Sequence, residues 1–268
     1  MDAAFRRRCR AQRATVAPGS ARIVCRERRI LAWDGCVNVR DLGGLPLVGG
    51  GETAYGVLVR SDALPSLSIA GREALVAYGV SLVVDLRAEH EYSSDPVEPL
   101  PLPVRHEPMD PRDVPAVQEW TSMREAYLSL IDRFRTEFAR VLTALGNAEP
   151  PVAVHCQSGR DRTGIACGLA LWLAGVTPEA IAIDHALSDE TLAPRNESWF
   201  ASATDEREQA RRRRIAAPAH RTLAAVLQEV DERKGIRALL LRAGADATAL
   251  DRLAARLRDG PPANTVFW

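Results

Sequence analysis

The chain has 268 residues, which is enough for one large domain or two small ones. It is 46% hydrophobic, and 35 Lys and Arg balance 35 Asp and Glu, so the composition excludes intrinsic disorder and leaves no net charge to attract nucleic acid. The five cysteines form no CxxC pair, no apolar run reaches about 18 residues, and the basic N-terminus precedes no hydrophobic stretch. We therefore expect a soluble, cytoplasmic protein without disulfides or a signal peptide, with export by a non-classical route left open.

The first third of the chain is predicted to contain strands, tight turns and one helix. Residues 1–20 form a flexible basic arm, and the β-branched residues of 21–33 predict an edge hairpin. Residues 55–59 are predicted as a strand and 68–78 as a helix that ends at a glycine. The apolar run at 80–86 ends in charged residues, which is typical of a buried parallel strand at its functional end.

The middle of the chain alternates strand and helix. A proline-rich loop over 95–115 precedes a long amphipathic helix at 120–145. Residues 151–155 are a buried strand, followed directly by a helix at 164–174. This order predicts an α/β fold with a central, mainly parallel sheet flanked by helices, in a single domain over 21–268.

The last third is predicted to be helical around one polar insert. After a helix at 178–187, residues 188–216 are polar and show little periodicity, except for Trp199 and Phe200. We predict that this insert is a helical, mobile lid whose apolar side covers the functional cleft. Three closing helices are predicted at 218–233, 237–241 and 246–257.

The segment 155–164 reads HCQSGRDRTG and lies between the strand 151–155 and the helix 164–174. At this junction the backbone N–H groups curl into a nest in front of a helix N-terminus, which suits a tetrahedral phosphate dianion. Arg162, six residues after Cys156, can hold two phosphate oxygens in a bidentate manner. We expect the other phosphate-binding residues to be Gln157, Ser158, Gly159, Arg160 and Thr163.

Cys156 is the predicted nucleophile of this loop. The helix N-terminus and the surrounding N–H donors favour its thiolate, which attacks without a general base. Thr163 is placed to hydrogen-bond the thiolate when it leaves in a second step. His155 is expected to orient the loop through its ring nitrogens.

These residues resemble the cysteine-dependent protein tyrosine phosphatase (PTP) superfamily, whose signature is HCx5R followed by Ser or Thr. The loop is most similar to that of bacterial tyrosine and phosphoinositide phosphatases that read HCxxGKDRTG. Residues 38–44, NVRDLGG, are similar to that group's NxRDLGG block, and residues 83–87, VVDLR, to its VxDLR strand end. The resemblance covers most of the chain and implies a PTP-like fold, and we expect Arg40 and Asp41 to support the phosphate loop.

The sequence departs from the resembled group at one loop position and leaves the general acid open. The loop lysine is Arg160 here, which weakens the link to lipid phosphates, and no WPD-type loop is evident. Asp85 matches a proposed acid of the group, but it could instead pair with Arg87 or Arg60. Asp161 lies inside the loop, where it could protonate the leaving oxygen or only stabilise the loop.

We therefore predict a protein tyrosine phosphatase that works through a phosphocysteine, with phosphotyrosine protein or phosphoinositide as the substrate partner. One alternative is a phosphoinositide or inositol phosphate phosphatase. Another is a catalytically silent protein that binds phosphorylated partners, which the presence of Cys156, Arg162 and Thr163 disfavours. No cofactor or metal is expected, because the histidines are scattered and this chemistry needs no ion.

Overall fold

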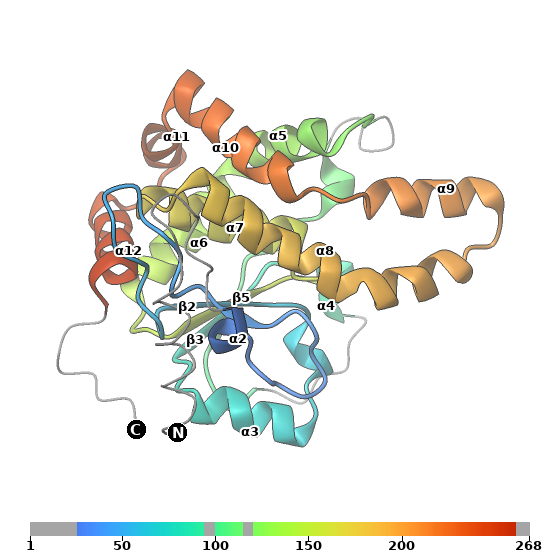
Figure 1. Cartoon of the computed structure of the whole chain (residues 1–268), viewed down its shortest axis with the longest axis horizontal. Helices are drawn as coiled ribbons and strands as arrows, with labels where there is room; N and C mark the ends of the chain where they lie inside the picture. Colours follow the sequence, from blue (N-terminus) through green and yellow to red (C-terminus); the bar gives the residue numbers. More distant parts are fainter. Residues whose placement is uncertain (1–25, 94–99, 115–119, 261–268) are drawn as a thin grey trace, which may run out of the picture.

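Five short strands form one sheet within the described residues 26–93, 100–114 and 120–260 of the computed structural model (Figure 1). In their order across the sheet, the strands are β1 (Arg40–Asp41), β2 (Leu58–Ser61), β5 (Val152–His155), β3 (Leu82–Asp85) and β4 (Val104–His106). β1 is antiparallel to β2 and every other pair is parallel, which confirms the predicted mainly parallel sheet. Ser61, His155 and Asp85 are in register, so three strands end together at one edge.

Helices cover both faces of this sheet. The α-helices of the described residues are α2 (Arg26–Arg29), α3 (Ile69–Ala77), α4 (Glu89–Ser93), α5 (Met123–Arg133), α6 (Arg135–Asn147), α7 (Asp161–Leu173), α8 (Pro178–Ala201), α9 (Glu206–Ile215), α10 (His220–Lys234), α11 (Ile236–Arg242) and α12 (Ala247–Asp259). Short 3-10 turns occupy Leu64–Ser66 and Pro111–Asp113. No described helix is both long and apolar enough to cross a bilayer.

Alternation along the strands divides the core into two layers. Val59, Val83 and Ala153 face one side, where they pack in a cluster with Leu75 of α3. The residues between them, such as Val154, face the larger cluster built by α5 to α8 and α10 to α12. This arrangement places α3 on one side of the sheet and the remaining long helices on the other (Figure 1).

Two predicted elements differ in the structure. The single helix predicted over 120–145 is two helices, α5 and α6, separated at Phe134, whose φ of −104° and ψ of 22° leave the helical region. The ring of Phe134 is buried in the main core, so the bend allows both helices to pack against α7. Of the edge hairpin predicted over 21–33, residues 21–25 lie outside the described residues. Residues 26–29 form α2, Ile30 makes an isolated antiparallel bridge with Arg40, and Arg29 is held by a buried ion pair with Asp184.

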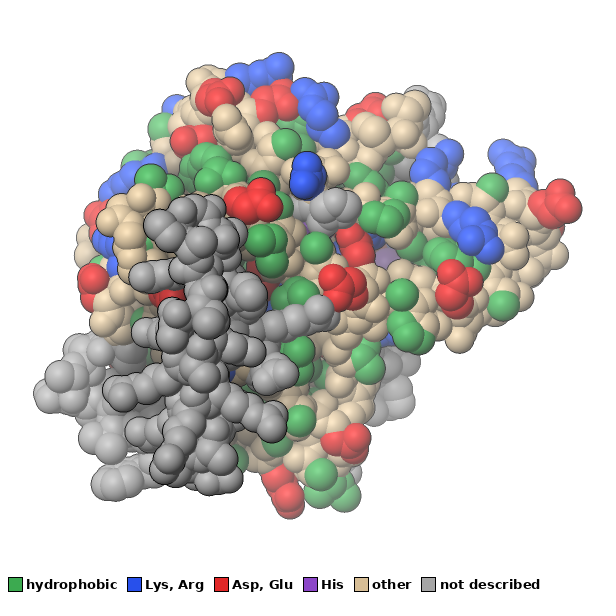
Figure 2. All heavy atoms as spheres, in the orientation of Figure 1, with side chains coloured by type: hydrophobic (Ala, Val, Ile, Leu, Met, Phe, Trp, Pro, Cys, Tyr) green, Lys and Arg blue, Asp and Glu red, His purple; other side chains and the backbone are tan. Residues whose placement is uncertain are grey.

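The predicted helix 178–187 extends through the insert to Ala201 as α8, and α9 follows it. Together α8 and α9 form a hairpin that projects from the body of the protein, with Arg side chains along its outer part (Figures 1 and 2). The part of α8 within the insert shows little apolar periodicity because its buried residues are only Ser188, Leu192 and Phe200. The predicted N-terminal arm, 1–20, lies outside the described residues.

Candidate active site

The segment 155–164 forms a tight loop from the end of β5 to the start of α7. Cys156 follows β5 directly, and Asp161 is the first residue of α7. Gly159 has φ +68°, and a Cβ on this residue would lie 2.3 Å from the carbonyl oxygen of Ser61 in β2. Only glycine satisfies both this backbone conformation and this close approach, so the loop packs tightly on the end of β2.

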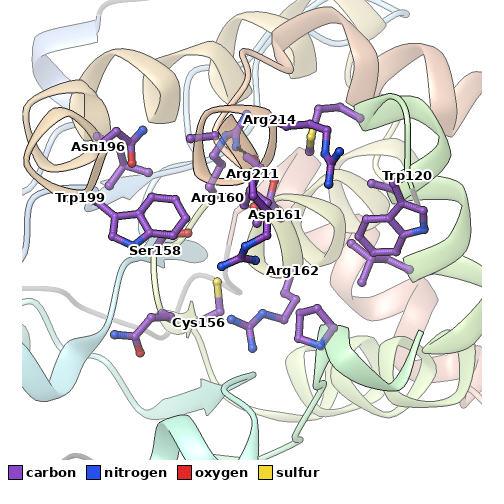
Figure 3. Close-up of a pocket in the computed structure, with 18 of the residues that line it drawn as sticks. Trp120, Cys156, Ser158, Arg160, Asp161, Arg162, Asn196, Trp199, Arg211 and Arg214 are labelled. Carbon is purple, nitrogen blue, oxygen red and sulfur yellow. Dashed lines mark hydrogen bonds and ion pairs between the residues drawn. The ribbon is translucent and has the colours of Figure 1, made fainter. Parts of the chain in front are cut away.

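A cavity of about 500 Å3 lies over the loop (Figure 3). Cys156 and Arg162 line it from the loop, and in Figure 3 they lie between Trp199 of α8 on one side and Trp120 on the other. The apolar part of the wall is formed by Trp120, Met123, Ala126, Leu130, Leu192, Trp199 and Ile215. Such a cavity suits a ligand with an anionic end and a flat apolar body.

Arg162 is oriented by a carboxylate that the sequence did not single out. Its Nη1 and Nη2 donate to Glu91 of α4 at 2.5 and 2.9 Å, and Nη1 also donates to the carbonyl oxygen of Met109 at 3.0 Å. Burial disfavours a charged Glu91, but the hydrogen bonds and the charge of Arg162 outweigh it and hold the pKa of Glu91 below its ordinary value. Glu91 sits in a run of charged residues, where no sequence signal separates it from its neighbours.

The carbonyl groups of the loop are bound by side chains from the β1–β2 region. The Nδ2 of Asn38 donates to the carbonyl oxygen of Ser158 at 2.9 Å, and an Nη2 of Arg60 donates to that of Gly159 at 2.7 Å. Arg40 in turn donates to the Oδ1 of Asn38 at 2.6 Å. Because N–H and C=O point in opposite directions across a trans peptide, carbonyls held on this side turn N–H groups toward the cavity.

Behind the loop, Asp184 of α8 joins three arginines in a buried charge cluster. Its carboxylate forms ion pairs with Arg40 at 2.9 Å, with Arg60 at 2.8 Å, and with Arg29. Although burial opposes ionisation of Asp184, the three arginines hold its pKa well below the ordinary value. Burial and the neighbouring Arg60 lower the pKa of Arg40 to about 10. Arg40 therefore lies where loop support was expected, and the sequence did not indicate the roles of Arg29 and Asp184.

Asp41 stabilises a different loop. Its carboxylate accepts hydrogen bonds from the backbone N–H groups of Gly43 and Gly56, at 2.5 and 2.8 Å, and from the hydroxyl of Tyr78. These contacts close the turn between β1 and β2. The carbonyl oxygen of Asp41 accepts from Arg29, which links this turn to the charge cluster.

Asp85 lies beneath the loop, beside His155. Its carboxylate accepts from the Nε and Nη2 of Arg87 at 3.0 and 2.9 Å, and lies 3.5 Å from the Nε2 of His155. Asp85 is 1% exposed and is absent from the described residues that line the cavity. Burial alone would raise the pKa of Asp85, but the charge of His155 and the hydrogen bonds and charge of Arg87 outweigh it, so this pKa is below its ordinary value. The Nδ1 of His155 lies 3.3 Å from the carbonyl oxygen of Cys156, so this ring bridges Asp85 and the loop.

Asp161 is the candidate acid that lines the cavity together with Cys156 and Arg162. Its side chain is 28% exposed, and its Oδ1 accepts a hydrogen bond from the hydroxyl of Tyr127 at 2.8 Å. The two candidate aspartates therefore occupy different positions. One is sealed beneath the loop, and the other borders the space in which a ligand would bind.

The guanidinium of Arg160 is engaged by the helices beyond the loop. Its Nε donates to Asp189 of α8 at 2.8 Å, its Nη1 to the carbonyl oxygen of Ile215 at 3.0 Å, and its Nη2 to that of Ala217. One nitrogen thus binds α8, and the other two bind the segment at the end of α9. The side chain expected to contact phosphate lines the cavity and also ties the loop to the α8–α9 hairpin.

Two further loop side chains have buried polar atoms without a partner among the described residues. They are the Oγ1 of Thr163 and the Oε1 of Gln157. Gln157 and Ser158 line the cavity, and Thr163 is fully buried at the start of α7. Donation from the Thr163 hydroxyl to the Cys156 thiolate stays a prediction.

Comparisons with known proteins agree with this geometry. The profile described as the tyrosine phosphatase family matches residues 31–259. A protein of Cupriavidus necator named "Putative tyrosine-protein phosphatase" is 32% identical over 208 residues, which are 72% of this chain and 75% of that protein. A protein of Nostoc commune named "Tyrosine-protein phosphatase" is 32% identical over 147 residues, 50% of this chain and 49% of that protein.

Proposed function

The chain belongs to the tyrosine phosphatase family and is an enzyme of that class, and from this premise we propose that it hydrolyses phosphotyrosine through a phosphocysteine at Cys156. The observation that carries the proposal is the convergence of Cys156, Arg162 and Asp161 on one cavity from a single loop. A nucleophile, a phosphate ligand and a proton donor are the three groups that this reaction needs.

The first step transfers the phosphoryl group to sulfur. The Cys156 thiolate attacks phosphorus, the bond from phosphorus to the ester oxygen breaks, and the leaving oxygen takes a proton. Arg162, whose guanidinium is already oriented by Glu91, binds two of the phosphoryl oxygens, and the N–H groups of the loop bind the others.

Asp161 is the proposed acid of this step. It borders the cavity and is partly exposed, whereas Asp85 is sealed beneath the loop with its oxygens bound by Arg87. In the second step the Asp161 carboxylate takes a proton from water, which attacks phosphorus and releases phosphate and the Cys156 thiolate. The hydroxyl of Thr163 donates to that thiolate as it leaves.

The walls of the cavity support an aryl phosphate as the substrate. Trp120 and Trp199 lie at its sides, and Leu192 and Ile215 extend the apolar surface of the α8–α9 hairpin. A phenyl ring that enters between them buries apolar area, which contributes about 25 cal/mol per Å2. The phosphate end then reaches Cys156 at the base of the cavity.

The proposal is tested with Cys156→Ser. A seryl hydroxyl stays protonated at neutral pH, so turnover of p-nitrophenyl phosphate is expected to fall at least about 100-fold while the loop still binds phosphate esters. Mass spectrometry of acid-quenched wild-type enzyme should show a phosphoryl group on the peptide that contains Cys156, and none in the variant.

Cys36→Ser is the matched control, because Cys36 is a half-buried thiol that hydrogen-bonds the carbonyl oxygen of Ala63. It should keep turnover close to that of the wild type. A Cys156→Ser enzyme that retains more than about 1% of wild-type turnover would show that the phosphocysteine pathway is wrong.

A further inference from the structure

Asp161 is connected to two buried side chains that the proposed reaction does not use. The hydroxyl of Tyr127 in α5 donates to the Oδ1 of Asp161 at 2.8 Å, and the Nε2 of His185 in α8 lies 2.9 Å from the same hydroxyl oxygen. Tyr127 and His185 are both 0% exposed. The carboxylate at the cavity is therefore the outer end of a chain of three side chains from α5, α7 and α8.

The number of protons that each group can donate fixes the direction of these two hydrogen bonds. The Tyr127 hydroxyl gives its one proton to Asp161, so its oxygen can only accept from His185, which must carry a proton on Nε2. The Nδ1 of His185 is accordingly a buried atom without a partner among the described residues. Gly164 of α7 leaves room for the ring, since a Cβ there would lie 2.9 Å from this Nδ1.

Burial keeps the protonation states of His185 and Tyr127 fixed. It lowers the pKa of His185 well below the ordinary value, and Arg60 and Arg160 lower it further. It also raises the pKa of Tyr127 well above the ordinary value, with the charge of Asp161 acting in the same direction. His185 is thus neutral and Tyr127 protonated around neutral pH, so both donate toward the cavity.

We propose that Tyr127 and His185 are positioning residues for the general acid Asp161, which they hold through two hydrogen bonds that point toward its Oδ1. The inference rests on the proposed function of Asp161 as the acid. With Oδ1 held by Tyr127, Oδ2 is the oxygen that exchanges the proton with the leaving group and then with water. The Asp161 carboxylate is then the base of the second step.

Charged and titratable groups face this chain from every element around it. They are Arg160 of the loop, Arg162 of α7, Asp184 and Asp189 of α8, Arg40 of β1 and Arg60 of β2, while Cys156 and Glu91 face Arg162. All of these groups are common to the wild type and to the variants below. A pH-dependent limb that moves only in variants of Tyr127 or His185 therefore reports on the chain.

The test compares pH–rate profiles on phosphotyrosine for Tyr127→Phe, His185→Asn and His185→Gln. The glutamine amide nitrogen occupies the position of Nε2 and can donate to Tyr127, whereas that of asparagine reaches only the position of Nδ1. Tyr127→Phe and His185→Asn should lower kcat about tenfold at unchanged KM, because the acid is no longer held in place. They should also move the alkaline limb up by about half to one pH unit, because the ionised carboxylate loses a donor. His185→Gln should stay within about twofold of the wild type with its limb in place.

Asp161→Asn separates failure of this inference from failure of the proposed function. If Asp161→Asn keeps the alkaline limb, the acid assignment and the positioning chain are both wrong. If Asp161→Asn removes the limb while Tyr127→Phe and His185→Asn leave it at the wild-type pH, only the positioning chain is overturned.

A measurement on the unmodified protein covers the case in which a variant does not fold. Nitrogen-15 spectra should show the Nε2–H tautomer of His185 without protonation from about pH 8 down to about pH 5. An Nδ1–H tautomer, or titration of His185 within that range, would overturn the inference without any substitution.

Discussion

At the scale of the residue, the contacts of Arg162 explain why an arginine suits the proposed phosphate site. Its guanidinium has five N–H donors in a planar fork, and Glu91 and the Met109 carbonyl take three of them. An arginine can therefore be oriented by a carboxylate and still present donors to a phosphoryl group. A lysine ammonium at the same place could not bind the carboxylate and the phosphoryl group in this way at the same time.

The two aspartates differ in the same way, by what each carboxylate already contacts. Asp85 is bound by Arg87 and lies beside His155, and the ion pair keeps its pKa low. A carboxylate held in this way is a poor proton donor, and Asp85 is buried and does not line the cavity. Asp161 accepts one hydrogen bond and borders the cavity.

We therefore predict that the effect of Asp161→Asn depends on the leaving group of the substrate, whereas the effect of Asp85→Asn does not. Asp161→Asn should lower turnover of phosphotyrosine about 100-fold but that of an activated aryl phosphate only a few-fold, because a good leaving group needs little protonation. Asp85→Asn should affect both substrates alike, through the packing of His155 and the loop. Steady-state kinetics on the two substrates measures the ratio. If the ratio changes in Asp85→Asn and not in Asp161→Asn, the acid is Asp85.

At the scale of the element, the α8–α9 hairpin and the phosphate loop are joined by one side chain. Arg160 binds Asp189 in α8 and the carbonyl oxygens of Ile215 and Ala217 at the end of α9. The hairpin also supplies Leu192, Trp199 and Ile215 to the cavity wall. Its function as a mobile lid stays a prediction, and this contact is where its position would be coupled to the loop.

We predict that Arg160→Lys loosens α9. A single ammonium cannot reach Asp189 and both carbonyl oxygens at once, so at least one hydrogen bond is lost, at about 1 kcal/mol. Hydrogen exchange of residues 206–215 should become about fivefold faster. Helix α3, on the other face of the sheet, is the internal control and should exchange as in the wild type. Unchanged exchange in α9 would show that Arg160 does not hold the hairpin.

At the scale of the whole molecule, several ionisable groups are buried around the candidate active site. Asp184 pairs with three arginines, and Asp85 pairs with Arg87. His155 and His185 are buried nearby, and burial lowers the pKa of both below the ordinary value of 6.5. The stability of the fold must therefore depend on pH through groups that also support the active site.

Stability is expected to fall in two stages as the pH decreases. The folded state binds fewer protons than the unfolded state on His155 and His185, so their contribution is complete above pH 6.5 and is lost below it. Each histidine adds up to about 1.4 kcal/mol per pH unit to this slope. Asp184 and Asp85 have lowered pKa values, so their contribution is complete above the ordinary 3.8 and is lost below it.

Urea unfolding at a series of pH values measures this dependence. His185→Gln should flatten the slope below pH 6.5 by the share of one histidine, because glutamine does not titrate. A wild-type stability that is constant from pH 6.5 to pH 5, or an unchanged slope in the variant, would contradict the assignment of neutral, buried histidines.

The sequence was sufficient for the features that depend on contiguous residues. The strand 152–155, the loop and the helix 161–173 were all predictable, because a short apolar run, a glycine and a helix start shape the backbone locally. Residues 155–164, with the matching segments 38–44 and 83–87, therefore indicated the enzyme family. The mainly parallel sheet followed from the alternation of strands and helices.

Tertiary structure alone decided which distant side chains meet at that loop. Glu91 reaches Arg162 across 71 positions, and Arg29 reaches Asp184 across 155, so no local pattern marks either pair. The same is true of the chain from His185 through Tyr127 to Asp161. Apolar periodicity reveals a helix face that packs in a hydrophobic core, but it gives no sign of the buried ion pairs that Asp184 of α8 forms. Those pairs exist only once the sheet edge, α5 and α8 have come together, because a buried charge is stable only beside its partner.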